Sequence, residues 1–456
     1  MKKSSFVLLV LAATALVGCG GGATSSAKTS SAAASSAAAS STAASSSTMS
    51  QVNGVDFFQL EETDIGTSDT VASGKLSAFS STNPLKISMV TDSGTLNDHS
   101  FNESAWNGIN AFAVKNGGTL NTTANVCDTG IVQTKYYQPA ADAYTTPGRV
   151  AAIKSAVTWG AKVVVLPGYL FQSAIKVCLD DAFYKDTCFL ALDCTKFDSD
   201  NNYAAYDYTN KVTSVIYREE QAGFEAGYGA VKEGYRKLGF CGGMAVPAVV
   251  RYGSGYCQGA DVAAKELSLA DGAVGVQYYY AGAFAATDTA TSYCTAWYKA
   301  GTEVIFGCGG AVYNSVIAGS QANGNKPWIG VDVNQHADTT LGASQASCIT
   351  SAMKNLKNST VIMLTSWVNE GCAWSSTYAG NVITVGAKSD NCVLPTPATT
   401  GDDGCWGFKT FTTTDYTTLL GKLKAGTIAV NSNSDNDSLS KHNFGCSAKV
   451  KVNYIE

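Results

Sequence analysis

The sequence lacks most of the residues and motifs that catalytic and metal sites use. Its 456 residues include only three histidines, His99, His336 and His442, and no C-x-x-C pair. A phosphate-binding loop, a G-x-S-x-G turn and an H-E-x-x-H helix are all missing. The aspartates that follow candidate strands have no metal-ligand spacing. These absences predict a protein that is not an enzyme and that needs neither a cofactor nor a metal.

Charge is scarce as well, and no basic block occurs. Charged residues make up 15% of the chain, and the formal net charge is −5. A nucleic-acid-binding protein usually shows a basic stripe, so the sequence predicts no nucleic-acid partner. No interior segment approaches the roughly 20 consecutive apolar residues that cross a bilayer. With 45% hydrophobic residues, the chain suits a globular protein of two domains or lobes.

The N-terminus has the pattern of a secretion signal. Lys2 and Lys3 precede an apolar run that ends in LVGC, so residues 1–18 are predicted to be a signal peptide. The LVGC ending resembles the lipobox of bacterial lipoproteins, which implies that Cys19 is lipidated. The alternative is a signal peptide that is cleaved nearby without lipid. Because two acyl chains give stable anchoring, we expect a protein held on the extracytoplasmic face of the cell membrane.

A flexible tether and one folded region are expected next. Residues 20–50 are almost entirely Gly, Ser, Ala and Thr, a composition that cannot bury a core. We therefore expect residues 19–83 to form the tether, with 52–81 poorly ordered or loosely docked. Residues 84–456 should form the folded domain.

Cysteine is plentiful for a chain predicted to lie outside the cytoplasm. Fourteen are present, and setting Cys19 aside leaves an odd number, so at least one is a free thiol or pairs with another chain. Cys178 with Cys188, and Cys392 with Cys405, are close enough in sequence to form disulfides. The sequence does not fix the connectivity.

After Pro84, short apolar runs alternate with helical stretches, which predicts an α/β fold with parallel sheets. The expected strands are 87–90, 163–166, 189–193, 214–217, 237–241, 274–280, 304–307, 328–332 and 347–350, with a weaker candidate at 426–430. The expected helices are 100–115, 149–159, 221–233, 252–267, 289–299, 313–323, 359–369 and 416–423. So many strands favour two lobes, each a mostly parallel sheet flanked by helices.

The first unit of the folded region proposes a ligand site. A buried strand at 85–91 is followed by an acidic loop that carries Asp92, Asn97 and Asp98. Ser100, with Glu103 three residues later, forms a capping-box pattern and predicts the start of a helix. Ligands bind beyond the carboxyl ends of strands in open α/β sheets, so the loop side chains are candidate contacts.

Later strands end in similar clusters. They are PGY at 167–169, GGM at 242–244, CGG at 308–310 and VDVNQ at 331–335. One such cluster means little, because an aspartate after a strand is often a turn former, but several together predict a ligand cleft. Glu219 and Glu220 follow another strand. We assign them to the dipole of a helix N-terminus, with acid–base work as the alternative.

Several blocks, in order, resemble the basic membrane protein family of purine-nucleoside-receptor lipoproteins. They are ISMVTDSGTLNDHSFNESAWNGI, VTSVIYREEQAGFEAGYGA, LGFCGGMAVPAVVRYGSGYCQG, AGAFAAT, EVIFGCGGAVYNSVI, WIGVDVNQ and ITSAMKN, and they cover about 86–367. The resemblance implies a two-lobed type I periplasmic-binding-protein fold. It also implies a purine nucleoside as ligand, delivered to the membrane permease of an ABC importer. We expect a monomer.

The resemblance also implies roles for individual residues. Phe101 matches a phenylalanine that stacks on the purine, although it would also suit a core. Tyr252 is the candidate for the second aromatic face, where we would expect phenylalanine, and Tyr169 is its rival. Asp332 and Lys354 match a pair that binds ribose hydroxyls, which suits a carboxylate and an ammonium. The alternative for that pair is a solvent-facing ion pair.

The remaining candidates are assigned from their chemistry. Side chains that offer donors and acceptors to a base edge or a sugar hydroxyl are Asp92, Asn97, Asp98 and Asn102. Two of them, Asp98 and Asn102, could equally cap the helix and brace its loop. Gly309 and Gly310 would allow close approach near the sugar.

Two other functions stay open at this point. One is a binding protein of the same fold for a sugar or another small solute, which needs no aromatic stacking. The other is a surface adhesin or sensor that uses the fold without transport. Neighbouring permease and ATPase genes would argue against the second.

Overall fold

The computed structural model describes residues 51–52, 55–56, 61–140, 144–432 and 443–455. The predicted signal peptide, Cys19 and most of the predicted tether lie outside these residues. All described residues belong to one unit, Thr42–Glu456. In this described part of the chain, no helix combines the length and the apolar character needed to cross a membrane.

Among the described residues, the first large sheet has six strands, all parallel. In order they are β17 (Val382–Val385), β11 (Val212–Tyr217), β8 (Cys188–Leu192), β7 (Val163–Pro167), β3 (Leu85–Val90) and β6 (Val132–Tyr137). Alternate side chains of a strand point to opposite faces. In β7, Val163 and Val165 join one buried cluster, whereas Val164 and Leu166 join another. The sheet is therefore buried on both faces.

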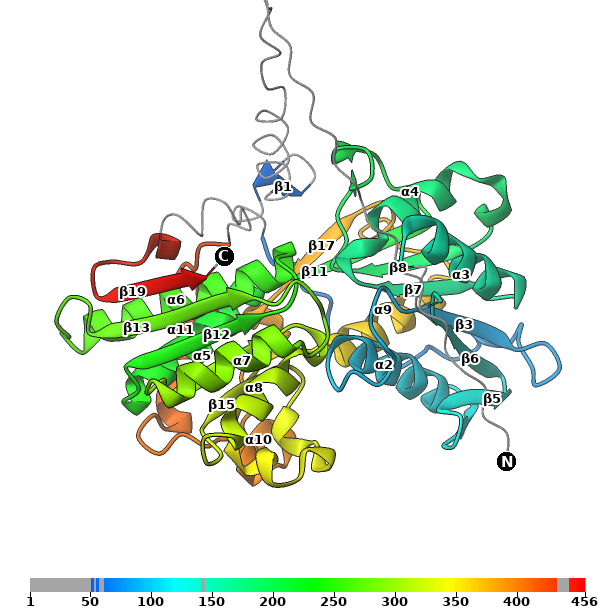
Figure 1. Cartoon of the computed structure of the whole chain (residues 1–456). Coiled ribbons are helices and arrows are strands. Elements are labelled where there is room, and N and C mark those ends of the chain that lie inside the picture. Colours follow the sequence, from blue (N-terminus) through cyan, green and yellow to red (C-terminus); the bar gives the residue numbers. More distant parts are fainter. Residues whose placement is uncertain (1–50, 53–54, 57–60, 141–143, 433–442, 456) are drawn as a thin grey trace, which may run out of the picture. The chain divides into compact units, whose positions relative to one another are not determined.

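Helices cover those two faces (Figure 1). One face packs against α2 (Phe101–Lys115) and α9 (Leu356–Asn369), and the other against α3 (Thr146–Thr158) and α4 (Gln172–Asp180). We call this sheet with its four helices the first lobe.

The second large sheet has seven strands within the described residues. In order they are β18 (Cys392–Val393), β16 (Cys348–Lys354), β15 (Trp328–Asp332), β14 (Val304–Cys308), β12 (Lys237–Gly242), β13 (Val274–Tyr280) and β19 (Val450–Ile455). All neighbours are parallel except β18, which is antiparallel to β16. One face packs against α5 (Glu219–Glu233) and α6 (Pro247–Glu266), and the other against α7 (Asp288–Lys299) and α8 (Tyr313–Gln321). This is the second lobe, and the predicted α/β architecture is confirmed.

The smaller elements lie between or beside these lobes. They are the strand pairs β1 (Gln51–Val52) with β2 (Val55–Asp56), β4 (Gly118–Asn121) with β5 (Val126–Gly130), and β9 (Phe197–Asp198) with β10 (Ala204–Ala205), and the helices α10 (Pro397–Thr400) and α11 (Thr413–Lys424). Short 3₁₀ turns include η2 (Tyr169–Phe171), η4 (Gly310–Val312), η5 (Gln335–Ala337) and η7 (Ala387–Ser389).

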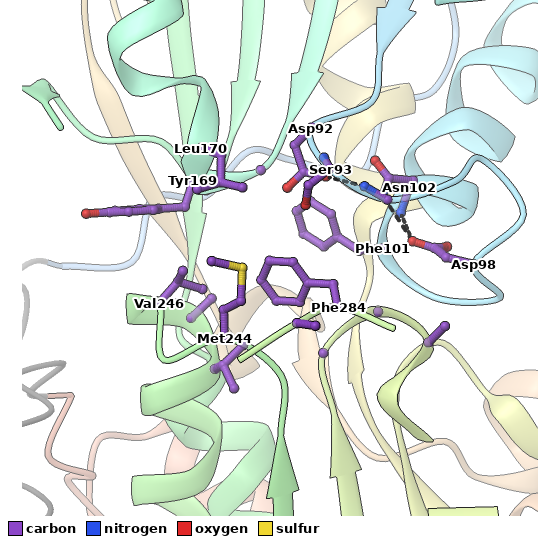
Figure 2. A pocket seen from close by; sticks show the side chains of 18 of the residues that line it. Asp92, Ser93, Asp98, Phe101, Asn102, Tyr169, Leu170, Met244, Val246 and Phe284 are labelled. Carbon is purple, nitrogen blue, oxygen red and sulfur yellow. Dashed lines mark hydrogen bonds between the residues drawn. The ribbon is translucent and has the colours of Figure 1, made fainter. Parts of the chain in front are cut away.

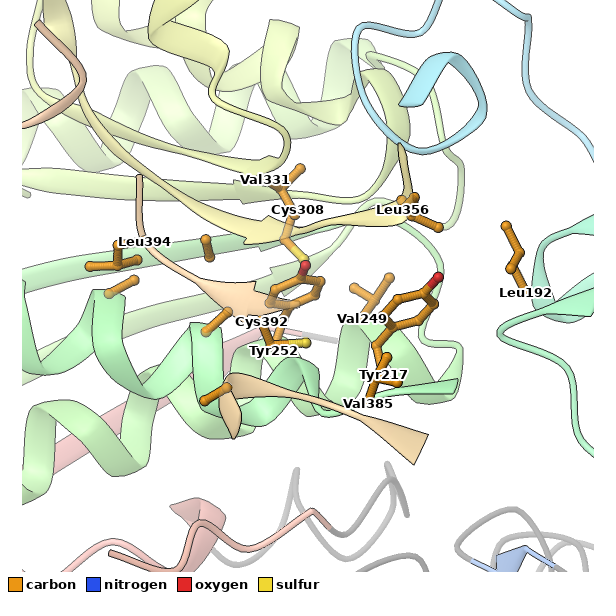
Figure 3. Close-up of a cluster of buried hydrophobic side chains, with 14 of the residues drawn as sticks. Leu192, Tyr217, Val249, Tyr252, Cys308, Val331, Leu356, Val385, Cys392 and Leu394 are labelled. Atoms are coloured by element: carbon orange, nitrogen blue, oxygen red, sulfur yellow. The ribbon is translucent and has the colours of Figure 1, made fainter. Parts of the chain in front are cut away.

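The chain passes between the lobes at three places. It leaves β11 at Arg218, leaves β16 at Asn355, and runs from β17 to β18 through residues 386–391. These crossings are hydrogen-bonded to each other, because Arg218 N donates to Val385 O at 2.9 Å and Asn355 N donates to Asn391 O at 2.8 Å. Buried side chains lie close to the crossings, among them Tyr217, Leu356, Val385 and Cys392 (Figure 3).

Helices α5 and α6 pack with their backbones in contact. Four glycines lie against carbonyl oxygens of the opposite helix; they are Gly223, Gly227, Gly255 and Gly259. A Cβ at Gly223 would come within 2.1 Å of the Tyr252 carbonyl oxygen, and one at Gly259 within 1.9 Å of the Phe224 carbonyl oxygen. Since real Cβ atoms do not approach that closely, only glycine fits at these positions.

Residues 61–83 contact the folded domain at a few points, and Ile65 is the one buried residue of 61–81, which agrees with the loosely docked alternative of the expectation. Ile65 is 6% exposed and belongs to the main core. Thr63 N donates to Thr384 O of β17. The Glu62 carboxylate accepts from Gln221 Nε2 at 2.9 Å and from Lys388 N at 3.0 Å, next to two of the crossings. Few apolar residues are involved, which is why the sequence left loose docking and poor order open as alternatives.

Two further expectations are corrected. Residues 426–430 form a turn and bends after α11, not a strand. Cys178, Cys188, Cys392 and Cys405 are free thiols, so neither of the two disulfides that the sequence spacing allowed is present.

Candidate functional site

A cavity of about 500 Å³ lies at the carboxyl ends of strands from both lobes. This volume falls in the usual range for small-molecule sites. The lining residues that matter below are Asp92, Asp98, Phe101, Asn102, Tyr169, Asp193, Met244, Val246, Tyr252, Phe284, Gly309, Gly310, Asp332 and Lys354. Figure 2 shows part of this lining.

The loop after β3 is held by Asp98. Its carboxylate accepts from the backbone N–H groups of Ser100 at 3.0 Å, Asn102 at 2.9 Å and Glu103 at 3.1 Å. Burial raises the pKa of Asp98 to about 6, against the opposing effect of these donors. The capping-box prediction is therefore wrong, because Ser100 makes no side-chain cap and Asp98 takes that role.

Ser100 is used elsewhere, at the boundary of the lobes. Its Oγ donates to Asp332 Oδ2 of the second lobe at 2.5 Å. Tyr252 OH donates to the other oxygen, Asp332 Oδ1, at 3.3 Å. Asp332 is 4% exposed, and burial raises its pKa. Tyr252 is also buried, and its ring lies edge-on to Phe306 at 5.9 Å between centroids.

One side of the cavity is aromatic and apolar. Figure 2 shows the rings of Phe101 and Phe284 next to each other, with Met244 and Val246 nearby. Phe101 begins α2 of the first lobe, whereas Phe284 lies in the loop after β13 of the second lobe. Two rings from different lobes thus border the same space.

The predicted glycines make room for Phe284. Gly309 has φ +111° and Gly310 has φ +53°, values that favour glycine. A Cβ at Gly310 would lie 2.7 Å from the Phe284 carbonyl oxygen, and one at Gly309 would lie 3.4 Å from its ring. Both glycines line the cavity next to Phe284, and their place near a sugar stays a prediction.

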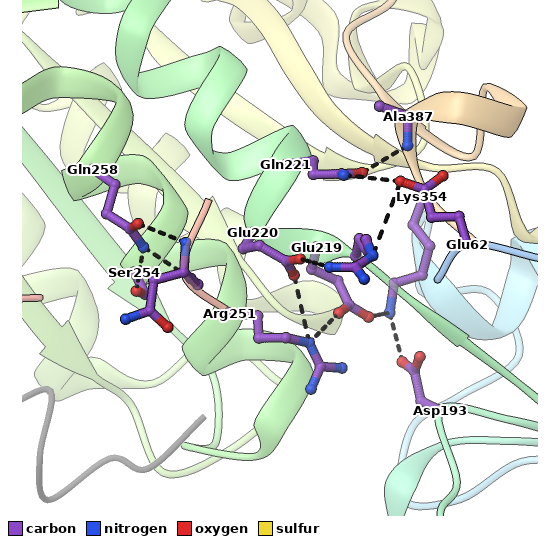
Figure 4. Close-up of polar contacts among 12 residues, drawn as sticks. Glu62, Asp193, Glu219, Glu220, Gln221, Arg251, Ser254, Gln258, Lys354 and Ala387 are labelled. Carbon is purple, nitrogen blue, oxygen red and sulfur yellow. Dashed lines mark hydrogen bonds and ion pairs between the residues drawn. The ribbon is translucent and has the colours of Figure 1, made fainter. Parts of the chain in front are cut away.

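A buried cluster of charges adjoins this aromatic side (Figure 4), and its Lys354 Nζ lies 4.8 Å from the centroid of the Phe101 ring. Lys354 Nζ lies 2.5 Å from Asp193 Oδ2 and 2.7 Å from Glu219 Oε1. Arg251 Nε lies 2.6 Å from Glu219 Oε2. Burial alone would lower the pKa of Lys354, but the carboxylates of Asp193, Glu219 and Asp332 outweigh it and raise the pKa. The lysine is therefore a fixed cation that joins the two lobes.

This cluster corrects one alternative and extends one prediction. Lys354 is 1% exposed, so a solvent-facing ion pair with Asp332 is wrong. Glu219 and Glu220 do lie in the first turn of α5, as the dipole assignment predicted. Their side chains are also paired, because Arg218 Nη1 lies 3.4 Å from Glu220 Oε1 in addition to the Glu219 contacts.

Of the predicted site residues, only Asn97 does not line the cavity, and it is exposed. The prediction missed Asp193, Met244, Val246 and Phe284. Phe284 follows a strand as the single aromatic of AGAFAAT, and that position was its available signal. Asp193 likewise follows β8 directly, with φ +61°.

The two described histidines, His99 and His336, lie outside this cavity and pair with aspartates. His99 Nδ1 lies 3.1 Å from Asp338 Oδ2, and His336 Nδ1 lies 2.9 Å from Asp402 Oδ2. Neither histidine lines the cavity. Within the described ranges, no group of three or more His, Cys, Asp or Glu residues is placed to hold a metal.

The family model described as ABC transporter substrate-binding protein PnrA-like (Bmp) matches residues 85–398. The chain belongs to this Bmp family. The resemblance to basic membrane proteins is thus confirmed. This Bmp-family chain is 27% identical over 259 residues to the ABC transporter nucleoside-binding protein BmpA of Lactococcus lactis, covering 55% of this chain and 64% of that protein.

Other relatives agree with this assignment. The CD4+ T-cell-stimulating antigen of Listeria monocytogenes is 26% identical over 238 residues, covering 51% of this chain and 56% of the antigen. Basic membrane protein B of Borreliella burgdorferi is 27% identical over 184 residues, covering 40% of this chain and 50% of that protein. The Bmp-family chain thus matches between half and two thirds of the length of these relatives.

Solved structures share the fold. An ABC transporter solute-binding protein from Aeropyrum pernix K1 aligns with a TM-score of 0.58 at 18% identity, covering 79% of this chain and 99% of that one. A second, from Conexibacter woesei, aligns with a TM-score of 0.54 at 18% identity, covering 76% and 99%. At this identity they support the two-lobed fold of the Bmp-family chain and nothing finer.

Proposed function

We propose that this chain is the substrate-binding protein of an ABC importer and that it binds a nucleoside, with a purine base. The observation that carries the proposal is the pairing of two phenylalanine rings from different lobes beside a buried charged cluster. Phe101 and Phe284 offer π-faces to a flat base. The printed name of the Lactococcus relative, a nucleoside-binding protein, supports the same ligand class.

The charged end suits the sugar of such a ligand. The carboxylate of Asp332 accepts hydrogen bonds from Ser100 and Tyr252, and it could instead accept them from the hydroxyl groups of a ribose. Lys354, held by Asp193 and Glu219, donates to hydroxyl oxygens while its charge stays neutralised. We assign the base to the aromatic side and the ribose to this end.

The same charges favour a nucleoside over a nucleotide. Asp92, Asp193 and Asp332 line the cavity, and Lys354 is the cation among its described lining residues. A phosphate would face several carboxylates at short range, which is repulsive in a poorly solvated site. Phosphorylated ligands should therefore bind weakly.

The remaining parts of the proposed role concern transport. A ligand that contacts both lobes favours the closed arrangement of the lobes, in which both contacts exist. The closed protein would then dock on the permease. Anchoring through lipidated Cys19 would keep a monomeric protein at the extracytoplasmic face of the membrane. Residues 19–60 would then act as the tether.

Calorimetry on the chain from Gly20 onward tests the ligand class. Purine nucleosides should bind, whereas their 5′-phosphates and free ribose should bind at least tenfold more weakly. Binding of free sugars with no binding of any nucleoside would replace the proposal by a sugar-binding role. Labelling with radioactive palmitate, compared with a Cys19→Ala variant, tests the anchor.

A further inference from the structure

Glu62 lies outside the cavity, yet its carboxylate contacts two of the three crossings between the lobes. Its Oε1 accepts a hydrogen bond from Gln221 Nε2 at 2.9 Å, at the start of α5. Its Oε2 accepts from the backbone N–H of Lys388 at 3.0 Å, in the segment between β17 and β18. The Glu62 side chain is only 10% exposed. One largely buried carboxylate therefore connects these two crossings.

Gln221 adds a third bond to this connection (Figure 4). Its Oε1 accepts from Ala387 N at 2.7 Å, and a carboxylate can only accept, so the amide must turn its Nε2 donor toward Glu62. Both side chains pack against Gly386, where a Cβ would lie 2.8 Å from Glu62 Oε1 and closer still to Gln221 Oε1. The position therefore has no room for a side chain. We call these three hydrogen bonds the crossing tie.

Both tied crossings lead within a few residues to Lys354 of the cavity. On one route, Gln221 lies two residues after Glu219, whose Oε1 is 2.7 Å from Lys354 Nζ. On the other route, the segment after β17 continues to Asn391, whose carbonyl oxygen accepts from Asn355 N at 2.8 Å. Asn355 directly follows Lys354 in the sequence. A shift of either crossing would therefore move the lysine.

We propose that Glu62 is a positioning residue for ligand binding, because the crossing tie holds the two crossings where they place Lys354 in the cavity. The proposal rests on the proposed nucleoside-binding function. When the binding arrangement is populated only part of the time, the affinity is reduced by that fraction. Loosening the tie lowers this population, so the affinity falls although no residue of the cavity has changed. The segment that follows the predicted tether thus takes part in forming the site.

Exchanging the two side chains tests the tie by rescue. In Glu62→Gln, the amide offers one acceptor and one donor group, so one of the three bonds is lost whichever way the two amides turn. The double variant Glu62→Gln/Gln221→Glu restores the complement. Its carboxylate at position 221 accepts from the new amide and from Ala387 N, while the amide oxygen at position 62 accepts from Lys388 N. The net charge is also that of the wild type.

Calorimetric titration of the chain from Gly20 onward with inosine, guanosine and adenosine measures the effect. For each nucleoside that the wild type binds, the affinity should fall at least about fivefold in Glu62→Gln and in Glu62→Ala. It should return to near the wild-type value in the double variant. Glu303→Ala is the matched control. It removes another half-buried carboxylate outside the cavity, one that accepts from Arg236 N at 2.6 Å and Lys237 N at 2.8 Å, and it should leave the affinity unchanged.

Hydrogen exchange of the ligand-free protein reports on the tie without a nucleoside. The amides of Ala387 and Lys388 donate to the exchanged side chains, so peptides spanning residues 384–391 should exchange faster in Glu62→Gln and at the wild-type rate in the double variant. Unchanged exchange in Glu62→Gln would refute the tie itself.

The outcomes separate this proposal from the proposed function. If no nucleoside binds to the wild type, the proposed function fails and the positioning role fails with it. If nucleosides bind, and all variants are folded by circular dichroism, the function stands. An unchanged affinity in Glu62→Gln, or a loss that the double variant does not restore, would then overturn the positioning role of Glu62 alone.

Discussion

The two ends of the cavity are built from opposite kinds of side chain. At the aromatic end, Phe101, Met244, Val246 and Phe284 are only half-buried. At the charged end, Asp193, Glu219, Asp332 and Lys354 are buried and contact partners from both lobes. The side chains of the first end are only partly buried against the main core, whereas those of the second end form a buried charge network that lies at the crossings. Substitutions should therefore affect ligand affinity at one end, and affinity together with stability at the other.

The largest effect is expected for Lys354→Met. Removing the cation leaves the buried Asp193 carboxylate without its ion-pair partner and Glu219 with Arg251 alone, which should cost about 3–5 kcal/mol of unfolding free energy. Nucleoside binding should be lost as well. Urea unfolding and calorimetric titration measure the two effects. Lys357→Met, on the exposed side of α9, should stay within about 0.5 kcal/mol of the wild type, and a similar result for Lys354→Met would contradict the role of the cluster.

Asp332→Asn should follow. Hydrogen bonds to charged groups contribute about 1.5–3 kcal/mol, so the affinity for a ribonucleoside should fall about 10- to 100-fold. A 2′,3′-dideoxynucleoside lacks the hydroxyls and should lose much less. Asp402→Asn, which alters a pair with His336 outside the cavity, serves as the control. Equal losses for both ligands in Asp332→Asn would place the ribose elsewhere.

Phe284→Ala should act on affinity alone. Stacking of a base on an aromatic ring contributes about 1–3 kcal/mol by alanine substitution, so nucleoside affinity should fall roughly 5- to 100-fold. The melting temperature should change far less than in Lys354→Met, because Phe284 is half-buried. Phe284→Tyr keeps the ring and should bind nearly as well as the wild type. Unchanged affinity in Phe284→Ala would remove this residue from the base platform.

The smallest expected effect is on the pH dependence of stability, which should differ between the neighbouring residues Glu219 and Glu220. Burial raises the pKa of Glu220 to about 7. Its contribution to stability is thus complete below its ordinary pKa and is lost as the pH rises through 7. Relative to the wild type, Glu220→Gln should gain on the order of 1 kcal/mol between pH 5 and pH 8. Thermal unfolding at a series of pH values measures this difference.

Glu219 should behave in the opposite way. Burial acts to raise its pKa, but Arg251 and Lys354 outweigh burial and hold the pKa below its usual value. Its contribution is therefore present above the ordinary pKa and is lost as the pH falls. Glu219→Gln should be least stable relative to the wild type at neutral pH, and a shared pH trend for the two variants would show that the pairing described here is incorrect.

The parts of the fold that the sequence predicted are those with strong local patterns. β7 and β15 are fully buried strands, and they show as apolar runs at residues 163–167 and 328–331. β6 and β19 were missed because they lie at sheet edges, where polar residues alternate with apolar ones. Helix α6 begins at Pro247, five residues before the predicted start, because its first turn uses proline and no polar cap.

The candidate site was predictable where an acidic side chain lies at or just beyond the end of a recognised apolar strand, as with Asp92 and Asp332. The pairing of Lys354 with Asp193 was not predictable, although Lys354 itself was a candidate. The two residues are 161 positions apart in the chain, so only the fold brings them together. Phe284 occupies space that two glycines in another loop leave free, and no local pattern records that fit.

The contact between α5 and α6 has a consequence for every distance in the charged end. Each carbonyl oxygen sits against a glycine of the other helix, so neither helix can slide along its neighbour by even one residue. This backbone lock sets the offset between Glu219 at the start of α5 and Arg251 on α6, and with it the position of the hydroxyl that Tyr252 presents to Asp332. Glycines of the α5–α6 contact therefore determine the geometry of the charged end. A methyl group added at Gly259, two turns from Arg251, would push the two helices apart and change the distance between Arg251 and Glu219.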